Sequence, residues 1–470
     1  MNTKHYKTPF ILPIAAFFLT IMGGAVLLSL PFAAAQEPID FIDALFTATS
    51  AVCVTGLASV DVFSSFSQGG QVVVLVLVQL GGIGVITYST LVFYLLGKKI
   101  SLRDRLAIRQ GLLSDPTFRL GTFLIKMVSA IFVLEVAGAL FLYWQEPEKI
   151  GLFNAVFLSI SAFCNAGFTP WADNLEQFNN DWAVTSCIMS LIVFGGLGYF
   201  ILQDSFRVLS HKTRATIKKL FRKTPSYEPL SDNPNPPVKL TYFSKVALST
   251  TIFLIVGGAL SVFITEWSNP SWAHSSFSER SLMALFLSVT SRTAGFSNTN
   301  LAHLSDFTLL ITICLMFIGG CPGSCAGGIK TTTFRVLLGS ALAQIRHRKQ
   351  IIVQGKAIAS SSYYKALLLF CCALLTIVLA TLLLIISENG ATPHNASPVL
   401  FLDIVVEVVS AFGTVGLSIN LTPNLSATGK CILCCVMFIG RLGPIWLITA
   451  IQQFQKEATF RYPETPIPVG

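Results

Sequence analysis

One short motif occurs four times in this chain, and the repetition constrains the fold more than any other feature of the sequence. Each copy is an apolar stretch that ends in a small residue, a glycine and a large apolar residue. The copies are Ser50–Leu57, Ser161–Phe168, Val289–Phe296 and Ser410–Leu417, and they recur at similar intervals. A repeat of this length indicates one structural unit that the chain uses four times.

The composition places these units in a membrane. Of the 470 residues, 53% are hydrophobic and 12% are charged, and the mean hydropathy is +0.68. A soluble domain carries about 25% charged residues. Eight apolar stretches are long enough to cross about 30 Å of hydrocarbon. They lie near residues 10–34, 71–97, 120–144, 182–206, 241–265, 305–340, 363–386 and 429–455, and the sixth and eighth contain internal breaks.

Each repeat is predicted to be a spanning helix, a short re-entrant helix and a second spanning helix. The short helices are expected over residues 40–52, 151–163, 278–290 and 397–412, and none is long enough to cross the bilayer. The fold class is therefore an all-α membrane protein with four such units around a common axis. The expected divisions are repeat 1 (1–97), repeat 2 (98–206), a cytoplasmic linker (207–239), repeat 3 with a broken second helix (240–345), and repeat 4 with a cytoplasmic tail (346–470).

The distribution of basic residues predicts the orientation. If the amino terminus is cytoplasmic, nearly all of the 32 Lys and Arg residues fall in cytoplasmic segments. Both termini are then cytoplasmic, and the net charge of +9 reflects contact with the lipid bilayer and no role with nucleic acid. The first apolar stretch resembles a signal peptide, but it is about twice the usual length of the apolar region, so we expect it to be retained as the first span.

The repeated motif has the chemistry of a cation filter. Backbone that leaves helical form at membrane depth is tolerated only where it is buried in protein or lines a water-filled path. Each short helix would direct the negative end of its dipole toward the axis, and carbonyl oxygens can replace the hydration shell of a monovalent cation. The predicted filter residues are Val52, Cys53, Val54, Thr55, Gly56, Cys164, Asn165, Ala166, Gly167, Arg292, Thr293, Ala294, Gly295, Gly413, Thr414, Val415 and Gly416. The ion would bind the carbonyls of Val54, Thr55, Asn165, Ala166, Thr293, Ala294, Thr414 and Val415.

A second glycine-rich motif follows each filter segment, at residues 81–84, 195–198, 319–323 and 440–443. In repeats 1 and 2 its glycines could equally serve close helix packing. Repeat 4 has Arg441 where the other repeats have glycine. An arginine at membrane depth costs at least about 2.5–3.5 kcal/mol, so it is expected to face the axis below the filter. The alternative is a structural arginine paired with a carboxylate or with carbonyls.

Repeat 3 contains a glycine-rich stretch, residues 319–328, that cannot remain helical. It is not a phosphate-binding loop, because Ile329 precedes Lys330 where that motif requires glycine. We predict an irregular loop that gates the path below the filter. The predicted gate residues are Gly319, Gly320, Gly323, Ser324, Gly327, Gly328, Lys330 and Arg441.

Together these motifs resemble the Trk/Ktr/HKT superfamily of potassium transporters over nearly the whole chain. The resemblance rests on the four filter segments, the broken helix of repeat 3 and Arg441. It implies a pseudo-fourfold potassium pore in each subunit, gated by the 319–328 loop and Arg441. It also implies a multi-pass protein of the cytoplasmic (inner) membrane, a homodimer, and a cytoplasmic ring of nucleotide-binding (RCK/KTN-type) regulatory subunits. Eight spans resemble the Ktr-type bacterial subunit more than the longer Trk type.

In this family, serine at the first filter position accompanies sodium selectivity, so Gly56 favours potassium. Sodium stays open as a permeant, coupling or regulatory ion, proton coupling stays open too, and no organic cofactor is expected. Repeat 3 departs from the pattern at Val289, where the other repeats have serine, and at Arg292. We expect Arg292 to brace the filter from behind or to pair with an acid such as Glu407.

Two functions from other classes compete with ion transport. An intramembrane enzyme would need a nucleophile–base pair or a metal set, yet the six histidines fall near helix ends or in loops and no His-Glu-x-x-His motif is present. A small-solute carrier would use the broken helix as its site, and two inverted halves would then be expected in place of four parallel repeats. The sequence therefore favours a transporter that is not an enzyme.

Overall fold

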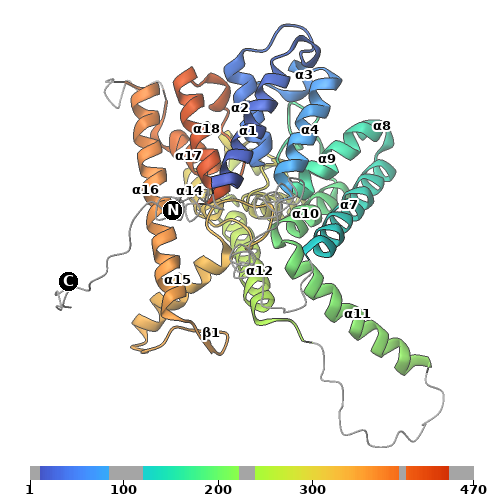
Figure 1. Ribbon diagram of the computed structural model, residues 1–470, viewed down its shortest axis with the longest axis vertical. Coiled ribbons are helices and arrows are strands. Elements are labelled where there is room, and N and C mark those ends of the chain that lie inside the picture. The colour runs from blue at the N-terminus through green and yellow to red at the C-terminus, as the bar shows by residue number, and fades with distance from the viewer. Residues whose placement is uncertain (1–10, 84–119, 222–238, 391–398, 444–470) are drawn as a thin grey trace, which may run out of the picture.

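The computed structural model describes residues 11–83, 120–221, 239–390 and 399–443, and these residues are almost entirely helical (Figure 1). The first two repeats contain α1 (Ile11–Leu28), α2 (Phe41–Cys53), α3 (Val62–Ser65), α4 (Gln68–Gly82), α7 (Leu120–Gln145), α8 (Pro147–Ile150), α9 (Leu152–Cys164), α10 (Trp182–Leu197) and α11 (Tyr199–Phe221). The last two contain α12 (Tyr242–Thr265), α13 (Phe277–Thr290), α14 (Asp306–Phe317), α15 (Thr331–Ile345), α16 (Ser360–Glu388), α17 (Phe401–Gly413) and α18 (Ala427–Leu442). A small hairpin of β1 (Ile352–Val353) and β2 (Lys356–Ala357) joins α15 to α16.

The four short helices α2, α9, α13 and α17 form the centre of the molecule. Polar residues begin two of them: the Asp40 carboxylate accepts from the backbone N–H of Ile42, and Ser276 forms a capping box with Glu279. Each short helix packs against the first long helix of its repeat through small residues. A Cβ at Gly138 would lie 2.5 Å from the Ser159 hydroxyl, for example, so a larger residue would push α7 away from α9.

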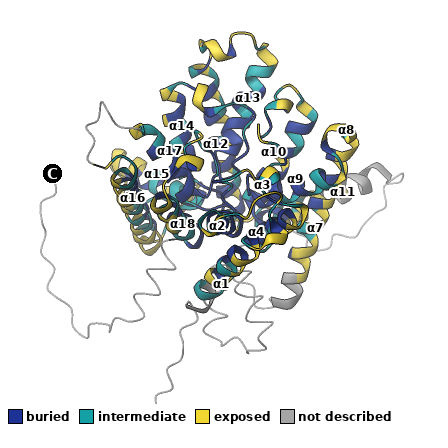
Figure 2. Cartoon of the chain, turned by 90° about the horizontal axis from the view of Figure 1, so that it is seen from above, coloured by how far each residue is buried: buried dark blue, intermediate teal, exposed yellow. Residues whose placement is uncertain are grey.

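The burial pattern is that of a protein surrounded by lipid. Buried residues gather at the centre, while exposed residues lie on the outer faces of α1, α7 and α16 (Figure 2). The outer face of α7 exposes large apolar side chains, among them Ile125 at 70% and Phe132 at 65%. Among the described residues, three helices are long and apolar enough to cross a bilayer, namely Ile125–Gln145, Tyr242–Thr265 and Ser360–Glu388, and the bent pair Trp182–Leu197 and Tyr199–His211 would be a fourth if it forms one span. The chain is a membrane protein, and the eight spans remain a prediction because the second spans of repeats 1 and 4 run into residues outside the described ranges.

The fourth apolar stretch differs from its expected form. We predicted one continuous span over residues 182–206, but α10 and α11 meet at an angle of 106° at Gly198. Gly198 has a φ of +79°, and a Cβ there would lie 2.7 Å from the carbonyl oxygen of Gly323. The bend therefore depends on contact with the loop of repeat 3, which the local sequence of α10 does not reveal.

The first part of the predicted cytoplasmic linker is helical. Residues 207–221 belong to α11, which extends away from the helical bundle in Figure 1. The proline-rich part of the predicted linker lies outside the described residues. Residues 207–221 are thus helical, and the cytoplasmic linker stays a prediction.

Candidate functional site

The glycines of the four repeated motifs meet in one closed ring. A Cβ placed on Gly56 would lie 2.5 Å from the carbonyl oxygen of Ala166 and 3.0 Å from the Cα of Gly167. A Cβ on Gly167 would lie 3.0 Å from the Cα of Gly295, one on Gly295 would lie 3.1 Å from the Cα of Gly416, and one on Gly416 would lie 3.0 Å from the Cα of Gly56. Each repeat therefore abuts the backbone of the next, in chain order, and the fourth abuts the first. No side chain fits at any of the four positions.

Strained backbone precedes each glycine of the ring. Val54, Asn165, Thr293 and Thr414, each two residues before its glycine, have φ values of 55°, 60°, 74° and 50°. Three of these residues are β-branched, for which a left-handed conformation is a genuine outlier. Such strain costs about 1–3 kcal/mol per residue and persists only where the surrounding structure enforces it, most often at functional sites. The same strain at the same register in all four repeats marks this ring as the candidate site.

Hydroxyl groups at the ends of the short helices hold the ring segments in place. The hydroxyl oxygens of Ser50 and Ser410 accept from the backbone N–H groups of Gly56 and Gly416, both at 3.0 Å. In repeat 2, the Ser161 hydroxyl donates to the carbonyl of Phe168 at 2.8 Å and accepts from its N–H.

Repeat 3 replaces this serine in a way that the sequence reasoning missed. Val289 occupies the serine position, but the hydroxyl of the next residue, Thr290, donates to the carbonyl of Phe296 at 2.6 Å. The chain after α13 also turns differently, since the Ala294 N–H bonds the Thr290 carbonyl across four residues, whereas the other three repeats form the corresponding bond across five. The polar residue beside Val289 was the available signal.

Not all of the predicted filter residues lie at the ring. Four of them occupy the last turns of the short helices, where their carbonyls belong to helix ends: Val52, Cys53, Cys164 and Gly413. The residues that adjoin the ring glycines are Thr55, Ala166, Ala294 and Val415, whose side chains are all buried.

A cavity with a volume of about 550 Å³ opens above the ring, and all four ring glycines line it. Three acidic residues, Asp61, Asp173 and Glu176, also line the cavity, and among the described residues that line it there is no lysine or arginine. A cavity lined by one sign of charge concentrates counter-ions, so this one favours cations at the ring.

The first glycine of the second motif packs against the short helix of its own repeat. A Cβ at Gly81 would overlap the carbonyl oxygen of Val52, and Gly195 and Gly440 meet Phe163 and Phe412 in the same way. The packing role is therefore present in repeats 1, 2 and 4. Gly319 is the exception, because the carbonyl of Gly327 occupies the corresponding space.

The loop of repeat 3 lies beneath the ring and contacts the other repeats. Its base is closed by bonds from the Gly319 N–H to the Ile329 carbonyl (2.8 Å) and from the Ile329 N–H to the Phe317 carbonyl (3.3 Å). The Cys321 N–H donates to the Gly196 carbonyl of repeat 2 at 2.9 Å, and the Cys325 thiol donates to the Gly82 carbonyl of repeat 1 at 2.9 Å. The loop thus ties together segments from different repeats.

Two of the predicted gate residues, Ser324 and Lys330, support the loop from inside it. The Ser324 hydroxyl accepts from the Ala326 N–H at 3.3 Å, and Lys330 precedes α15 while its ammonium donates to the Ala326 carbonyl at 2.5 Å. A Cβ at Gly320 would lie 2.6 Å from the Gly196 carbonyl oxygen, and Gly328 has a φ of +60°. Glycine is therefore needed at the first position for close approach and favoured at the second by its backbone conformation.

Arg441 joins the loop to repeat 1. Its side chain is 6% exposed, and its guanidinium donates to the carbonyl of Cys325 and, at 2.5 Å, to the carbonyl of Gly81. Its described partners are therefore backbone carbonyls, one of which belongs to the predicted gate loop.

The pairing expected between Arg292 and Glu407 is wrong. Arg292 is 7% exposed and donates to the carbonyls of Thr251 (3.3 Å) and Gly319 (3.2 Å), which links the end of α13 to α12 and to the base of the loop. Glu407 instead accepts from the hydroxyls of Ser418 and Thr422. The geometry around Arg292 agrees with the alternative expectation, a brace behind the ring.

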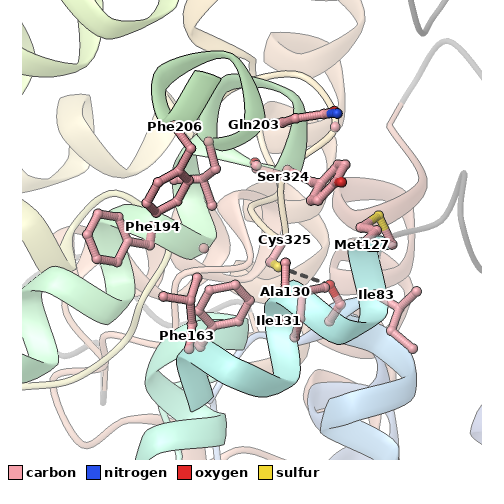
Figure 3. A pocket seen from close by; sticks show the side chains of 17 residues that line it. Ile83, Met127, Ala130, Ile131, Phe163, Phe194, Gln203, Phe206, Ser324 and Cys325 are labelled. Carbon is pink, nitrogen blue, oxygen red and sulfur yellow. Dashed lines mark hydrogen bonds between the residues drawn. The ribbon is translucent and has the colours of Figure 1, made fainter. Parts of the chain in front are cut away.

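A second cavity, of about 210 Å³, flanks the loop (Figure 3). Met127, Ile131, Phe194 and Phe206 line it together with Ser324 and Cys325 of the loop. The loop is consequently not packed tightly on this flank, so it has room to move.

The chain is similar in sequence and in fold to known proteins. The sequence matches the TrkH family, described as "Cation transport protein", over residues 3–462. It is 36% identical to the Ktr system potassium uptake protein B of Bacillus subtilis over 99% of this chain and 97% of that protein, and 34% identical to the potassium/sodium uptake protein NtpJ of Enterococcus hirae over 98% and 97%. The fold matches the crystal structure of the potassium transporter TrkH from Vibrio parahaemolyticus with a TM-score of 0.70 at 19% identity, covering 96% of this chain and 86% of that one.

Proposed function

The chain belongs to the TrkH family of cation transport proteins, and from this premise we propose that it takes up potassium across the cytoplasmic membrane through the glycine ring. The observation that carries the proposal is the closure of the ring by backbone from all four repeats, beneath a cavity lined by acids. Backbone carbonyls are the ligands that replace potassium hydration in selective filters.

The ion is proposed to bind the carbonyls of the two residues that precede each ring glycine. These are the carbonyls of Val54, Thr55, Asn165, Ala166, Thr293, Ala294, Thr414 and Val415. The tight packing of glycine against backbone leaves little freedom for the ring to contract, because each segment is already in contact with its neighbour. A ring that cannot contract favours the larger potassium ion over sodium.

Sodium is the second candidate ion. A relative of similar identity is named a potassium/sodium uptake protein, so sodium passage or coupling must be measured beside potassium. Glycine at all four ring positions supports potassium as the preferred ion, in line with the resemblance to the potassium transporters.

The 319–328 loop and Arg441 are proposed to form the gate. The loop lies below the ring, and bonds to carbonyls of repeats 1 and 2 hold it there. The guanidinium of Arg441 adds a positive charge beneath the ring and holds Cys325 of the loop by its carbonyl. Opening would break these bonds and move the loop toward the flanking cavity.

The assembly is also a proposal. We expect both termini in the cytoplasm of a multi-pass inner-membrane protein, a homodimer, and a cytoplasmic ring of RCK/KTN-type regulatory subunits. Relatives named as proteins of a Ktr system support a membrane subunit that works with other components.

Uptake of rubidium or potassium by cells that lack their own potassium uptake systems tests the proposed function. Expression of the chain should restore uptake at low external potassium, and sodium added in competition should reduce it only weakly. Gly56→Arg is a suitable inactive control, because no side chain fits at Gly56. Correctly inserted protein without potassium uptake, in the presence of the cytoplasmic subunit, would refute the proposal.

A further inference from the structure

Glu407 is an acidic residue in an unusual place. It lies in the middle of α17 and its side chain is fully buried, at 0% exposure. The four short helices contain three other acids, Asp43, Glu279 and Asp403, and all three lie in the first turn of their helix. Glu407 is therefore the one acid within the body of a short helix, close to the ring and away from the helix start.

The carboxyl group of Glu407 is bonded to the segment that leaves the ring. Thr422 Oγ1 donates to Glu407 Oε2 at 2.8 Å, and Ser418 Oγ donates to Oε1. Thr422 is buried at 1% exposure and begins a 3-10 turn. The two hydroxyls thus fasten both ends of the segment 418–422 to the helix that enters the ring.

No basic side chain shares this site in the part of the chain that the structure describes. The ion pairs found there join Lys149 to Glu146 and Lys430 to Asp43, and Arg292 is directed at carbonyls. A buried carboxyl needs hydrogen-bond donors, and at Glu407 the exit segment supplies them. Displacing that segment would leave the carboxyl without these donors, so the fastening is strong.

The fastened segment is continuous with the ring. Ser418 follows Leu417, which is 1% exposed, and Gly416, whose Cα lies 3.1 Å from a Cβ placed on Gly295. Ser418 also lines the cavity above the ring. Any movement of the exit segment is therefore passed to Gly416 and to its neighbours in repeats 1 and 3.

In repeats 2 and 3, the segments that follow the ring glycine are held by a different arrangement. In repeats 2 and 3 the two exit segments bond each other, through the Leu175 N–H to the Ser297 carbonyl (2.9 Å) and the Ser297 N–H to Asn174 Oδ1 (3.2 Å). In repeat 4 the segment 418–422 is tied to α17 by its side-chain bonds to Glu407, and further along the chain Ser426 Oγ donates to Glu388 of α16 at 2.6 Å. Segment 418–422 therefore obtains from this carboxyl what repeats 2 and 3 obtain from each other.

We propose that Glu407 is a positioning residue for ion selection, and this inference rests on the proposed potassium function. Its carboxyl group fixes the exit segment of repeat 4 and so holds Gly416, with the carbonyls beside it, at the spacing that suits potassium. Loss of the two hydroxyl bonds lets Gly416 shift, the fixed spacing is lost, and sodium then passes more readily relative to potassium.

The test compares Glu407→Gln with Glu266→Gln in proteoliposomes, using potassium and sodium flux. Glutamine keeps the size of the side chain but supplies one acceptor oxygen in place of two. Glu266 is the matched control, because it is also 0% exposed and accepts from a serine hydroxyl (Ser305 Oγ, 2.7 Å), but it lies at the end of α12. We expect the potassium-to-sodium flux ratio to fall by about fivefold or more in Glu407→Gln and to stay close to wild type in the control.

Two further variants keep the test decisive if Glu407→Gln does not fold. Ser418→Ala and Thr422→Val each remove one donor and leave the carboxyl in place, and each should lower the flux ratio less than Glu407→Gln. Ser418 adjoins the cavity, so its replacement by alanine does not disturb the core. Wild-type flux ratios in these folded variants overturn the role of Glu407. A wild-type protein without potassium flux overturns the proposed function instead, so the two failures are distinguishable.

Discussion

Replacing Gly56 by serine is the sharpest test of the ring. Gly56 has a φ of +93°, and a Cβ there would lie 2.5 Å from the carbonyl oxygen of Ala166 and 3.0 Å from the Cα of Gly167. Both neighbouring atoms are backbone, so the contact cannot be relieved by rotation of a side chain. The ring must widen or distort between repeats 1 and 2.

The magnitude follows from the backbone conformation and the contact. A residue other than glycine in such a conformation costs about 1–3 kcal/mol, and the contact with Ala166 adds to it. If this energy appears as a difference between the binding of potassium and of sodium at the ring, the potassium-to-sodium flux ratio changes by a factor of about 5 to 150. We therefore expect the potassium-to-sodium flux ratio of Gly56→Ser in proteoliposomes to fall at least to the lower end of that range.

A matched variant separates the effect of the backbone conformation from the effect of the contact with Ala166. Gly355, in the hairpin between α15 and α16, has a φ of +80°, and a Cβ there would meet no atom within 4 Å. Gly355→Ser should therefore lose a similar amount of stability in thermal unfolding and retain the wild-type flux ratio. A folded Gly56→Ser protein with the wild-type ratio would refute the assignment of the ring as the filter.

Three further predictions concern the gate and the outer face. Arg441→Ala removes the guanidinium that donates to the carbonyls of Cys325 and Gly81. Each of these bonds is worth about 1.5–3 kcal/mol, so basal flux should rise without loss of assembly. A wild-type flux rate would show that Arg441 has only a structural role. Shortening the loop within residues 320–328 should also raise basal flux in proteoliposomes, and a folded variant that stays closed would contradict the gate. Lys430→Met breaks the 2.5 Å ion pair with Asp43, which joins α18 to α2, and should lower the free energy of unfolding by about 1 kcal/mol or more, because the pair is largely buried. The same loss of stability when Asp43 has already been replaced by asparagine would show that the pair is not responsible.

The short helices could be predicted because their signals are local. The repeated motif gives the end of each helix and the apolar stretch before it gives the length, and α2 runs from Phe41 to Cys53 where residues 40–52 were expected. The meeting of the four glycines was a hypothesis from repetition, and the distances between Gly56, Gly167, Gly295 and Gly416 agree with it. Family membership followed from the same residues.

The bend at Gly198 and the partners of Arg292 could not be predicted, because both depend on contacts between segments that are far apart in the sequence. The Gly-Gly-Leu-Gly segment at 195–198 is compatible with a straight helix and with a bent one. In the structure Gly198 contacts Gly323 of the loop, and the helix is bent there. The partners of Arg292 are carbonyls, and a sequence does not show which carbonyls are left free inside a membrane protein. From the sequence, Glu407 was a possible partner of Arg292 because the two side chains carry opposite charges. In the structure the Arg292 guanidinium instead donates to the carbonyl of Gly319, at the base of the loop of repeat 3.

The closed ring also bears on how the protein is made. The carbonyl of Thr55 and the Cα of Gly56 adjoin Gly416, so the first repeat to leave the ribosome has no partner on one side until the last repeat is inserted. The Arg441–Gly81 bond and the Lys430–Asp43 pair join the same two repeats. Contacts between such distant segments form slowly, because a long loop must close before they contribute. A nascent chain therefore carries an open, unfinished ring through most of its synthesis, and the proposed filter is complete only when the final repeat is in place.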